Sequence, residues 1–347
     1  MAPPEELHIG GQVGGVWSLL EVKGAAGAPT DYVILRGELW GPEDRAKFEA
    51  FIKPVHRIIV MSSYQSFPGH NINPHDDPAR WPAVRFVEDR WKGQIVLWCH
   101  CFRRPELMWS DAERGRVPRV LISESDFYDP NTLTAHIKPA PRKYDFFCSM
   151  PEGEWNTFIR NVHLGAHWLN YMADGLGLKV LVVGPGRSKQ LSAKVTVVDR
   201  FLPWHEFVEH MGRCTHMFNP SFADASPRVI VEALSLDMPV LLNADILGGW
   251  KYINADTGAT FQMYEVGKSD ACDLPSEAYM RRTVEAFTRP AAPRLPGAAR
   301  KWIVAHAGPA IGARRLAEAV RGLGLDGQVA IEGFQEAPDR ARGCVVC

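Results

Sequence analysis

The chain has 347 residues, a length that predicts about two domains of ordinary size. Hydrophobic residues make up 46% of the sequence and charged residues 23%, which are values of a globular protein and exclude wholesale disorder. Lys and Arg number 39 and Asp and Glu number 40, so the net charge is -1. This balance argues against a broad basic surface for nucleic acid or anionic membrane, and we expect no nucleic-acid partner.

The sequence carries no sign of a membrane span or of a secretion signal. No stretch approaches the roughly 18 consecutive apolar residues of a membrane-spanning helix, and residues 1–6 lack the basic segment and apolar core of a signal peptide. The seven cysteines are scattered along the chain, which is typical of free thiols in a reducing compartment rather than of a disulfide framework. We therefore expect a cytoplasmic protein.

Short apolar runs in the first part of the chain predict strands over residues 31–39, 57–62, 94–100 and 119–123. Two of these segments contain continuous apolar runs instead of alternation, which is typical of parallel strands buried on both faces. The Gly-rich stretch 10–15 has no clear strand before it. We therefore interpret it as a turn and not as a phosphate-binding loop.

The second part of the chain alternates expected strands and helices. The strands are expected over residues 144–148, 179–183, 195–198, 215–218 and 239–242, and the helices over residues 155–172, 204–211 and 227–236. This rhythm is typical of βαβ units and predicts a parallel sheet with right-handed crossovers. A last helix is expected over residues 297–320, with a kink at Gly308 and Pro309.

Two proline-rich segments, near residues 138–142 and 289–296, interrupt these patterns and indicate boundaries. The expected organisation is an N-terminal domain, a C-terminal domain, a helical segment that packs back toward the N-terminal domain, and a loosely ordered tail. These parts cover residues 1–142, 143–290, 291–325 and 326–347, respectively.

The start of the helix expected over residues 227–236 has the features of an anion site. Ser226 is a good N-cap, and Pro227 suits the first helical position because its missing N–H costs nothing there. The helix would begin beyond the carboxyl end of a parallel strand, where open α/β sheets bind ligands. The free backbone N–H groups at this helix start and the helix dipole would therefore suit a diphosphate.

Two carboxylates flank this helix start. Asp224 precedes the N-cap, and Glu232 follows Arg228 by four residues, so that Arg228 and Glu232 share one face of the helix. A nucleotide sugar offers sugar hydroxyls, a diphosphate and a ribose diol, and the motif supplies a group for each. In isolation, the same spacing would indicate only a loop aspartate and a surface Arg–Glu pair.

The wider segment resembles the donor-binding motif of retaining GT-B glycosyltransferases, especially those of family 4. That motif has an acidic residue, seven residues and a Glu, followed by a Pro-led strand and a Gly-rich loop. Asp224, Glu232, Pro239 and Gly248-Gly249 match it here. The first acidic position is usually Glu in the family, so Asp224 is one methylene shorter. Residues 224–254 are also similar to a subgroup of algal and algal-virus glycosyltransferases.

The resemblance covers residues 144–261 well. It implies an α/β protein with the GT-B fold, in which two Rossmann-like domains with parallel sheets face a central cleft. It also implies a glycosyltransferase that moves a sugar from a nucleoside-diphosphate sugar to a hydroxyl of a glycan or glycosylated acceptor. The implied reaction retains the anomeric configuration and uses no metal or other cofactor, because the helix end and basic side chains neutralise the leaving diphosphate.

The resemblance also implies the roles of individual residues. Arg160 would lie against the diphosphate, and the backbone at Phe201 would meet the nucleobase. The implied catalytic residues are Asp224, Arg228 and His100, and the implied donor-binding residues are Arg160, Gly184, Phe201, Ser226, Pro227, Val229 and Glu232.

His100 has a second interpretation as a histidine packed at the end of the strand over residues 94–100. Glu124 and Asp126 follow another strand end, and we interpret them as solvated surface residues in preference to ligands of an acceptor hydroxyl. The turn at Gly184-Pro185-Gly186 suggests a dinucleotide site, but Lys189 stands where the third glycine would be, which argues against an NAD enzyme.

The residues alone are compatible with two functions besides glycosyl transfer. The same fold would serve a non-catalytic nucleotide-sugar-binding or assembly subunit, or a sugar-nucleotide epimerase. Two His and two Asp within residues 70–77 suggest a metal site, although an exposed loop is favoured. The chain ends in Cys344-Val345-Val346-Cys347, which has the form of a prenylation signal with an unusual last residue. Membrane contact is expected only if Cys344 is prenylated.

Overall fold

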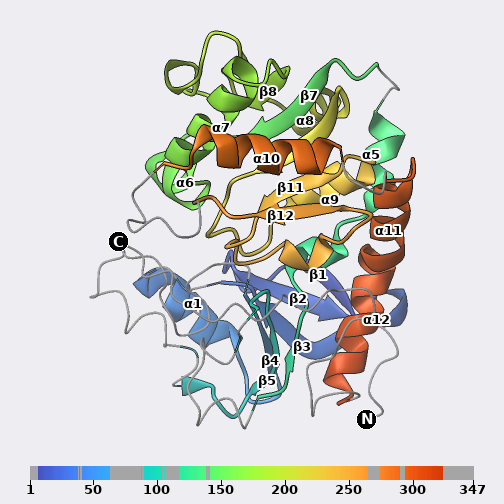
Figure 1. Ribbon diagram of the computed structural model, residues 1–347. Coiled ribbons are helices and arrows are strands. Elements are labelled where there is room, and N and C mark those ends of the chain that lie inside the picture. Colours follow the sequence, from blue (N-terminus) through green and yellow to red (C-terminus); the bar gives the residue numbers. More distant parts are fainter. Residues whose placement is uncertain are drawn as a thin grey trace. The chain divides into compact units, whose positions relative to one another are not determined.

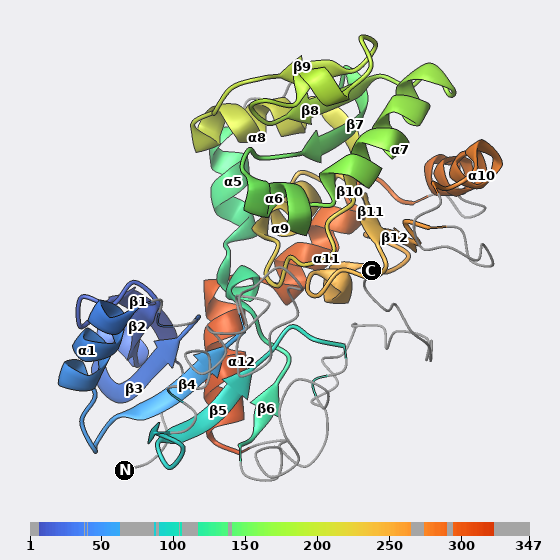
Figure 2. The ribbon, with the colours of Figure 1, turned by 90° about the vertical axis from the view of Figure 1, so that its left-hand side faces the viewer.

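The computed structural model describes residues 7–37, 39, 41–62, 87, 90–103, 105, 117–137, 141–264, 274–289 and 294–322. The chain divides into two compact units, whose elements are labelled in Figure 1 and Figure 2. The first unit ends at Tyr128 and takes up the chain again from Ala307, whereas the second runs from Asp129 to His306.

The chain passes into the second unit before residue 142, where the sequence indicates a boundary. Helix α5 (Pro130–His136) already belongs to the second unit, where it packs against α11 (Ala298–His306). The expected C-terminal segment 291–325 is divided as well. Its helix α11 belongs to the second unit and its helix α12 (Pro309–Val320) to the first.

In the described part of the chain, the sheet of the first unit has six strands in the order β1-β2-β3-β4-β5-β6. β3 to β6 pair in parallel, as the continuous apolar runs of β4 and β5 predict. β1 and β2 pair antiparallel with each other, and β2 with β3. The strands are β1 (His8–Gln12), β2 (Leu19–Lys23), β3 (Pro29–Leu35), β4 (Arg57–Met61), β5 (Ile95–Cys99) and β6 (Arg119–Val120).

The hairpin of β1 and β2 corrects the interpretation of the Gly-rich stretch. Gly10 and Gly11 lie inside β1, where a side chain at Gly10 would overlap Glu21 of β2. The turn is made by Gly14 and Gly15, whose φ angles of 64° and 66° lie in the left-handed region that glycine adopts without strain. The predicted turn is therefore right for the second half of the stretch and wrong for the first.

Helices α1 (Pro42–Phe51) and α12 belong to the first unit. Leu316 of α12 is buried in one apolar cluster with Leu97 of β5. The single helix expected over residues 297–320 is two helices, because Gly308 has a φ of 132° and interrupts the helical backbone.

The described sheet of the second unit has six parallel strands in the order β12-β11-β10-β7-β8-β9. The expected strands are confirmed as parallel, and β12 is a strand that the sequence did not indicate. The strands are β7 (Tyr144–Ser149), β8 (Val180–Val183), β9 (Thr196–Val198), β10 (Cys214–Asn219), β11 (Val240–Asn243) and β12 (Gly258–Phe261).

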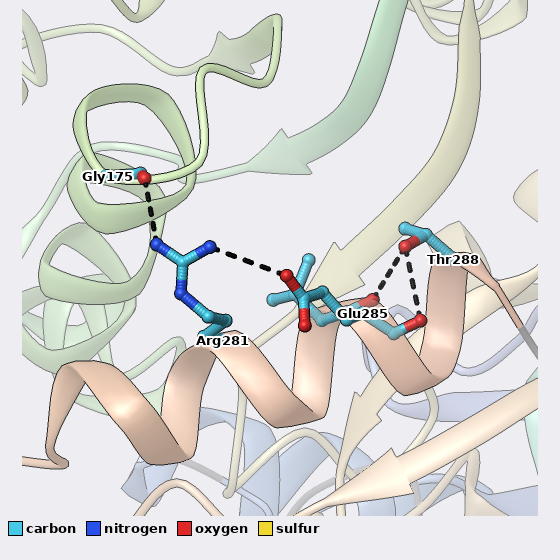
Figure 3. A network of polar contacts seen from close by, with 5 residues as sticks. Gly175, Arg281, Glu285 and Thr288 are labelled. Atoms are coloured by element: carbon cyan, nitrogen blue, oxygen red, sulfur yellow. Dashed lines mark hydrogen bonds and ion pairs between the residues drawn. The ribbon is translucent and has the colours of Figure 1, made fainter.

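Helices cover both faces of this second sheet. Figure 2 shows α7 (Val162–Asp174) and α10 (Glu277–Thr288) on one face and α8 (Trp204–Gly212) and α9 (Arg228–Ser235) on the other. Side chains of α7 and α10 form one buried apolar cluster with the strands. Arg281 of α10 also donates to the carbonyl oxygen of Gly175, the C-cap of α7, at 3.4 Å, as Figure 3 shows.

The helix expected over residues 155–172 is broken near its start. It forms α6 (Glu154–Ile159) and α7, and Asn161 between them has a φ of 51°. Asparagine tolerates this left-handed conformation better than most residues. The break leaves Arg160 at the end of α6, outside both helices.

None of the helices that the structure describes is both long and apolar enough to cross a membrane. Four cysteines are described, and each is buried: Cys99, Cys101, Cys148 and Cys214. Burial raises the pKa of the Cys214 thiol to about 12, so this thiol stays protonated at neutral pH. Residues 70–77 and the terminal motif at Cys344 lie outside the described residues.

Candidate functional site

The loop from β10 to α9 carries most of the motif residues and begins at the carboxyl edge of the second sheet. Asn219 at the end of β10 accepts a hydrogen bond from the Ser221 N–H at 3.0 Å. Asn243 at the end of β11 donates to the carbonyl oxygens of Pro220 and Ser221, at 3.2 Å each. Two asparagines at neighbouring strand ends therefore fix where the loop leaves the sheet.

The Gly-rich loop after β11 supports the same loop from its other side. The Leu247 N–H donates to Phe222 O and the Gly248 N–H donates to Asp224 O, both at 2.9 Å. A side chain at Gly248 would overlap the carbonyl oxygen of Ala225. Glycine is therefore required at Gly248 by a close approach of two main chains.

Helix α9 begins at Arg228, one residue later than the sequence predicts, and Pro227 is its N-cap. No side chain caps the helix, so the N-cap expected at Ser226 is wrong. Pro227 has a ψ of 88°, which is not helical, and its carbonyl oxygen accepts the Ile230 N–H at 3.0 Å. The first N–H groups of a helix have no acceptor within the helix. This end of α9 thus keeps the character of an anion site, with Val229 in its first turn.

Asp224 and Arg160 form an ion pair that joins two loops at this edge of the sheet. Arg160 Nη1 contacts Asp224 Oδ2, and their side chains are only 23% and 12% exposed. The break between α6 and α7 places Arg160 beside Asp224. In a continuous helix, the Arg160 side chain would project from the helix surface instead. The Ile159 carbonyl oxygen also accepts the Phe222 N–H at 3.1 Å, which ties the same two segments together.

Glu232 lies one turn into α9, with its side chain only 4% exposed. Its Oε1 accepts a hydrogen bond from the indole Nε1 of Trp204 at 3.0 Å. Arg228 Nε lies 3.5 Å from the same oxygen, from a side chain that is 64% exposed. The structure thus confirms that Arg228 and Glu232 share a helix face. Trp204 was not predicted, because its partner lies 28 residues away.

Gly184 is constrained by packing. A side chain there would overlap the carbonyl oxygen of Met150 at the end of β7. The buried Arg187 lies beside it and donates from Nε to Met150 O at 3.1 Å and from Nη2 to Thr157 Oγ1 at 3.1 Å. Burial lowers the pKa of the Arg187 guanidinium. The glycine turn after β8 therefore packs against the main chain at Met150, and Arg187 holds that main chain in place.

The segment after β9 presents an exposed aromatic ring. Phe201 is 80% exposed. Arg200 next to it is paired with Glu206 of α8 at 2.6 Å. The Ser188 hydroxyl, together with main-chain N–H groups, lowers the pKa of the Asp199 carboxyl. Polar contacts thus hold the backbone on the N-terminal side of Phe201.

His100 belongs to the first unit and follows β5. It is buried, and its ring centroid lies 5.2 Å from that of Trp98. Its main-chain N–H donates to the Val120 carbonyl oxygen at 2.9 Å. Glu124 pairs with Arg36 at 2.6 Å. Asp126 is fully buried and accepts the Ser123 N–H at 2.7 Å, so its interpretation as a solvated surface residue is wrong. Its carboxylate caps a short helix.

Among the described residues, no group of three or more His, Cys, Asp or Glu side chains could hold a metal ion. The structure brings together Arg160 with Asp224, and Arg228 with Glu232. All four lie in the second unit, whereas His100 lies in the first.

The arrangement of strands and helices is similar to that of several solved GT-B glycosyltransferases. OtsA without ligand matches with a TM-score of 0.54 at 8% identity, over 80% of this chain and 70% of that one. The pneumococcal O-GlcNAc transferase GtfA, solved with UDP and GlcNAc, matches with a TM-score of 0.53 at 8% identity, over 83% and 56%. Sucrose-phosphate synthase from Thermosynechococcus elongatus matches at 0.51 and 13% identity, over 81% and 71%.

The chain has the GT-B fold. It spans little more than half the length of the GtfA chain, at 56%. No family model matches the sequence, and no curated protein sequence matches it. At identities of 8% to 13%, the likeness to these structures concerns the fold alone.

Proposed function

We propose that this GT-B protein is a glycosyltransferase that moves a sugar from a nucleoside-diphosphate sugar to an acceptor hydroxyl on a glycan or glycosylated molecule. The proposal extends the activity of its structural neighbours, one of which was solved with UDP and GlcNAc, to a chain that shares their fold. Retention of configuration and a reaction without metal are part of the proposal.

The observation that carries the proposal is the position of Glu232. Its carboxylate is held almost out of solvent, in the second turn of the helix that follows the carboxyl end of β10. A buried carboxylate costs free energy unless it has partners, and Trp204 and Arg228 provide them. Such a pre-oriented acceptor pair suits the two hydroxyls of a ribose.

The other charged groups would act on the diphosphate and the sugar. Negative charge develops on the diphosphate as it leaves, and preorganised donors stabilise such charge most effectively. Arg160, Arg228 and the start of α9 would supply these donors. Asp224 would hold hydroxyls of the transferred sugar once Arg160 turns to the phosphate.

Thermal unfolding in the presence of a panel of nucleotide sugars tests the binding part of this proposal. A ligand that binds only the folded state raises the melting temperature with its concentration, so the true donor should stand out from its relatives. Release of nucleoside diphosphate from that donor tests turnover. A chain that no nucleotide sugar stabilises would contradict the proposal.

A second candidate is a nucleotide-sugar-binding or assembly subunit without turnover. The Arg160–Asp224 ion pair favours it, because the carboxylate proposed for the sugar is already engaged. This candidate predicts stabilisation by a nucleotide sugar without release of nucleoside diphosphate, in the presence or absence of acceptors.

A further inference from the structure

Trp204 is placed to control the orientation of the Glu232 carboxylate. It is the first residue of α8, and Pro203 is the N-cap of that helix. Its indole Nε1 donates to Glu232 Oε1 at 3.0 Å, and Arg228 Nε lies 3.5 Å from the same oxygen. Two cationic or polar donors from different helices therefore converge on one of the two carboxylate oxygens.

This convergence matters because a carboxylate rotates easily about its last side-chain bond. The terminal torsion of glutamate is broad and roughly two-fold, so its plane is set by the partners of its oxygens. The indole N–H can only donate, and a hydrogen bond to a charged acceptor is stronger than one between neutral groups. The bond from Trp204 therefore restricts the plane of the Glu232 carboxylate.

The attachment of α8 to the sheet has other sources. Val208 and Met211 of α8 are fully buried. Phe207 packs edge-on against Phe147 of β7, with 5.4 Å between ring centroids. Trp204 itself is only half-buried at the end of the helix. The fold of α8 thus does not need the indole N–H, which leaves its bond to Glu232 as the feature to explain.

We propose that Trp204 is a positioning residue that aligns Glu232 with the two hydroxyls of a ribose and so selects ribonucleotides over 2′-deoxyribonucleotides. The inference rests on the proposed function, in which Glu232 binds the ribose. A vicinal diol donates two hydrogen bonds to the two oxygens of one carboxylate only when that carboxylate lies in the plane of the diol. A 2′-deoxyribose offers one of these bonds and gains less from the alignment.

The test compares Trp204→Phe with the unchanged protein and with Trp302→Phe. Phenylalanine keeps an aromatic ring and removes the N–H donor. Trp302 is also a half-buried helical tryptophan of the second unit, stacked on His306 with 4.2 Å between ring centroids, so its variant controls for the smaller ring. Calorimetric titration gives the Kd of UDP, GDP and ADP and of their 2′-deoxy counterparts for each protein.

Trp204→Phe should weaken binding of the preferred ribonucleotide by about tenfold or more, the effect expected for one hydrogen bond to a charged group. The 2′-deoxy counterpart should lose less, so the ratio of the two Kd values should fall toward one. Trp302→Phe should leave that ratio unchanged. A tryptophan with a merely structural role would change both Kd values equally.

A double-mutant cycle with Glu232→Gln locates the effect. If Trp204 acts through Glu232, Trp204→Phe should change the ratio of Kd values little once Glu232→Gln is present. A Trp204→Phe protein that keeps the full ratio overturns the inference and leaves the proposed function standing. An unchanged protein that binds none of these nucleotides overturns the proposed function and the inference with it.

Discussion

Arg160 and Asp224 neutralise each other across the two loops that meet at the carboxyl edge of the second sheet. The proposed function assigns these side chains to different parts of the donor, the diphosphate and the sugar. A diphosphate would therefore have to break this ion pair, and Arg160 would exchange a carboxylate for a phosphate, since both accept two parallel hydrogen bonds from a guanidinium.

This exchange predicts opposite effects for its two partners. Arg160→Ala should weaken binding of the preferred nucleoside diphosphate at least about tenfold while changing the affinity for the corresponding nucleoside little, because only the diphosphate carries the charge that Arg160 would meet. Asp224→Asn should bind that diphosphate as tightly as the unchanged protein or more tightly, since Arg160 is released, but should turn over more slowly. Calorimetric titration with the nucleoside diphosphate and the nucleoside, and an assay of released nucleoside diphosphate, measure these effects. Equal loss of affinity for both ligands in Arg160→Ala would contradict the exchange.

Gly248→Ala should destabilise the second unit and disturb the loop that carries Asp224. The new methyl group would overlap the carbonyl oxygen of Ala225, and neither main chain can move without breaking the bond from the Gly248 N–H to Asp224 O. We expect a loss of about 3 kcal/mol in the free energy of unfolding, the upper range for overpacking, measured by urea denaturation. Gly212→Ala is the matched control, because its methyl group would lie 3.5 Å from Ile137 in ordinary contact. A Gly248→Ala protein as stable as this control would show that the two loops accommodate the added methyl group, which would contradict the prediction.

Arg228→Ala should slow turnover strongly and lower the free energy of unfolding by only about 1 kcal/mol. Its own side chain is 64% exposed, and the buried Glu232 carboxylate that it partners keeps the hydrogen bond from Trp204 in the variant. Removal of one preorganised donor to developing charge slows catalysis by about 100-fold or more. The rate of nucleoside diphosphate release and the melting temperature separate the two effects. Full-rate turnover by the variant would remove Arg228 from the mechanism.

His216 should make the protein less stable as the solution is acidified. Burial lowers its pKa below the ordinary histidine value of 6.5, and its ring packs against those of Phe146 and Phe287, with 5.3 and 5.2 Å between ring centroids. The unfolded chain therefore takes up this proton first as the pH falls through about 6.5, and folding stability declines from there until the folded-state pKa is passed. His216→Phe should show a shallower decline in the free energy of unfolding between about pH 7.5 and about pH 5.5. An unchanged slope in the variant would show that other groups dominate, such as His56 and His210, whose pKa values burial also lowers.

The strands of the second sheet could be predicted because burial on both faces leaves a direct mark on the sequence. β8, from Val180 to Val183, is apolar and buried at every position. The position of the motif after β10 followed from this pattern, because periodicity reports which face of an element is buried. The shared face of Arg228 and Glu232 followed from their spacing of four residues.

The remaining features depend on single backbone conformations or on contacts between distant segments. The helical pattern continues through Asn161, so periodicity does not reveal the left-handed residue that splits α6 from α7 and places Arg160. Ser226 and Pro227 both suit a helix start, and the non-helical ψ of Pro227 decides between them. The bond from Trp204 to Glu232 joins two helices across an intervening strand, and no local spacing encodes it.

The last described helix has a consequence for the order in which the protein assembles. α12 fills the core of the first unit, yet it is encoded after every residue of Asp129–His306 in the second. During synthesis the ribosome must therefore release the whole of Asp129–His306 before Leu316 can reach its place. The first unit thus begins synthesis first but completes its fold last. Until then, its apolar surface around Leu97 stays exposed in the nascent polypeptide, where chaperones act.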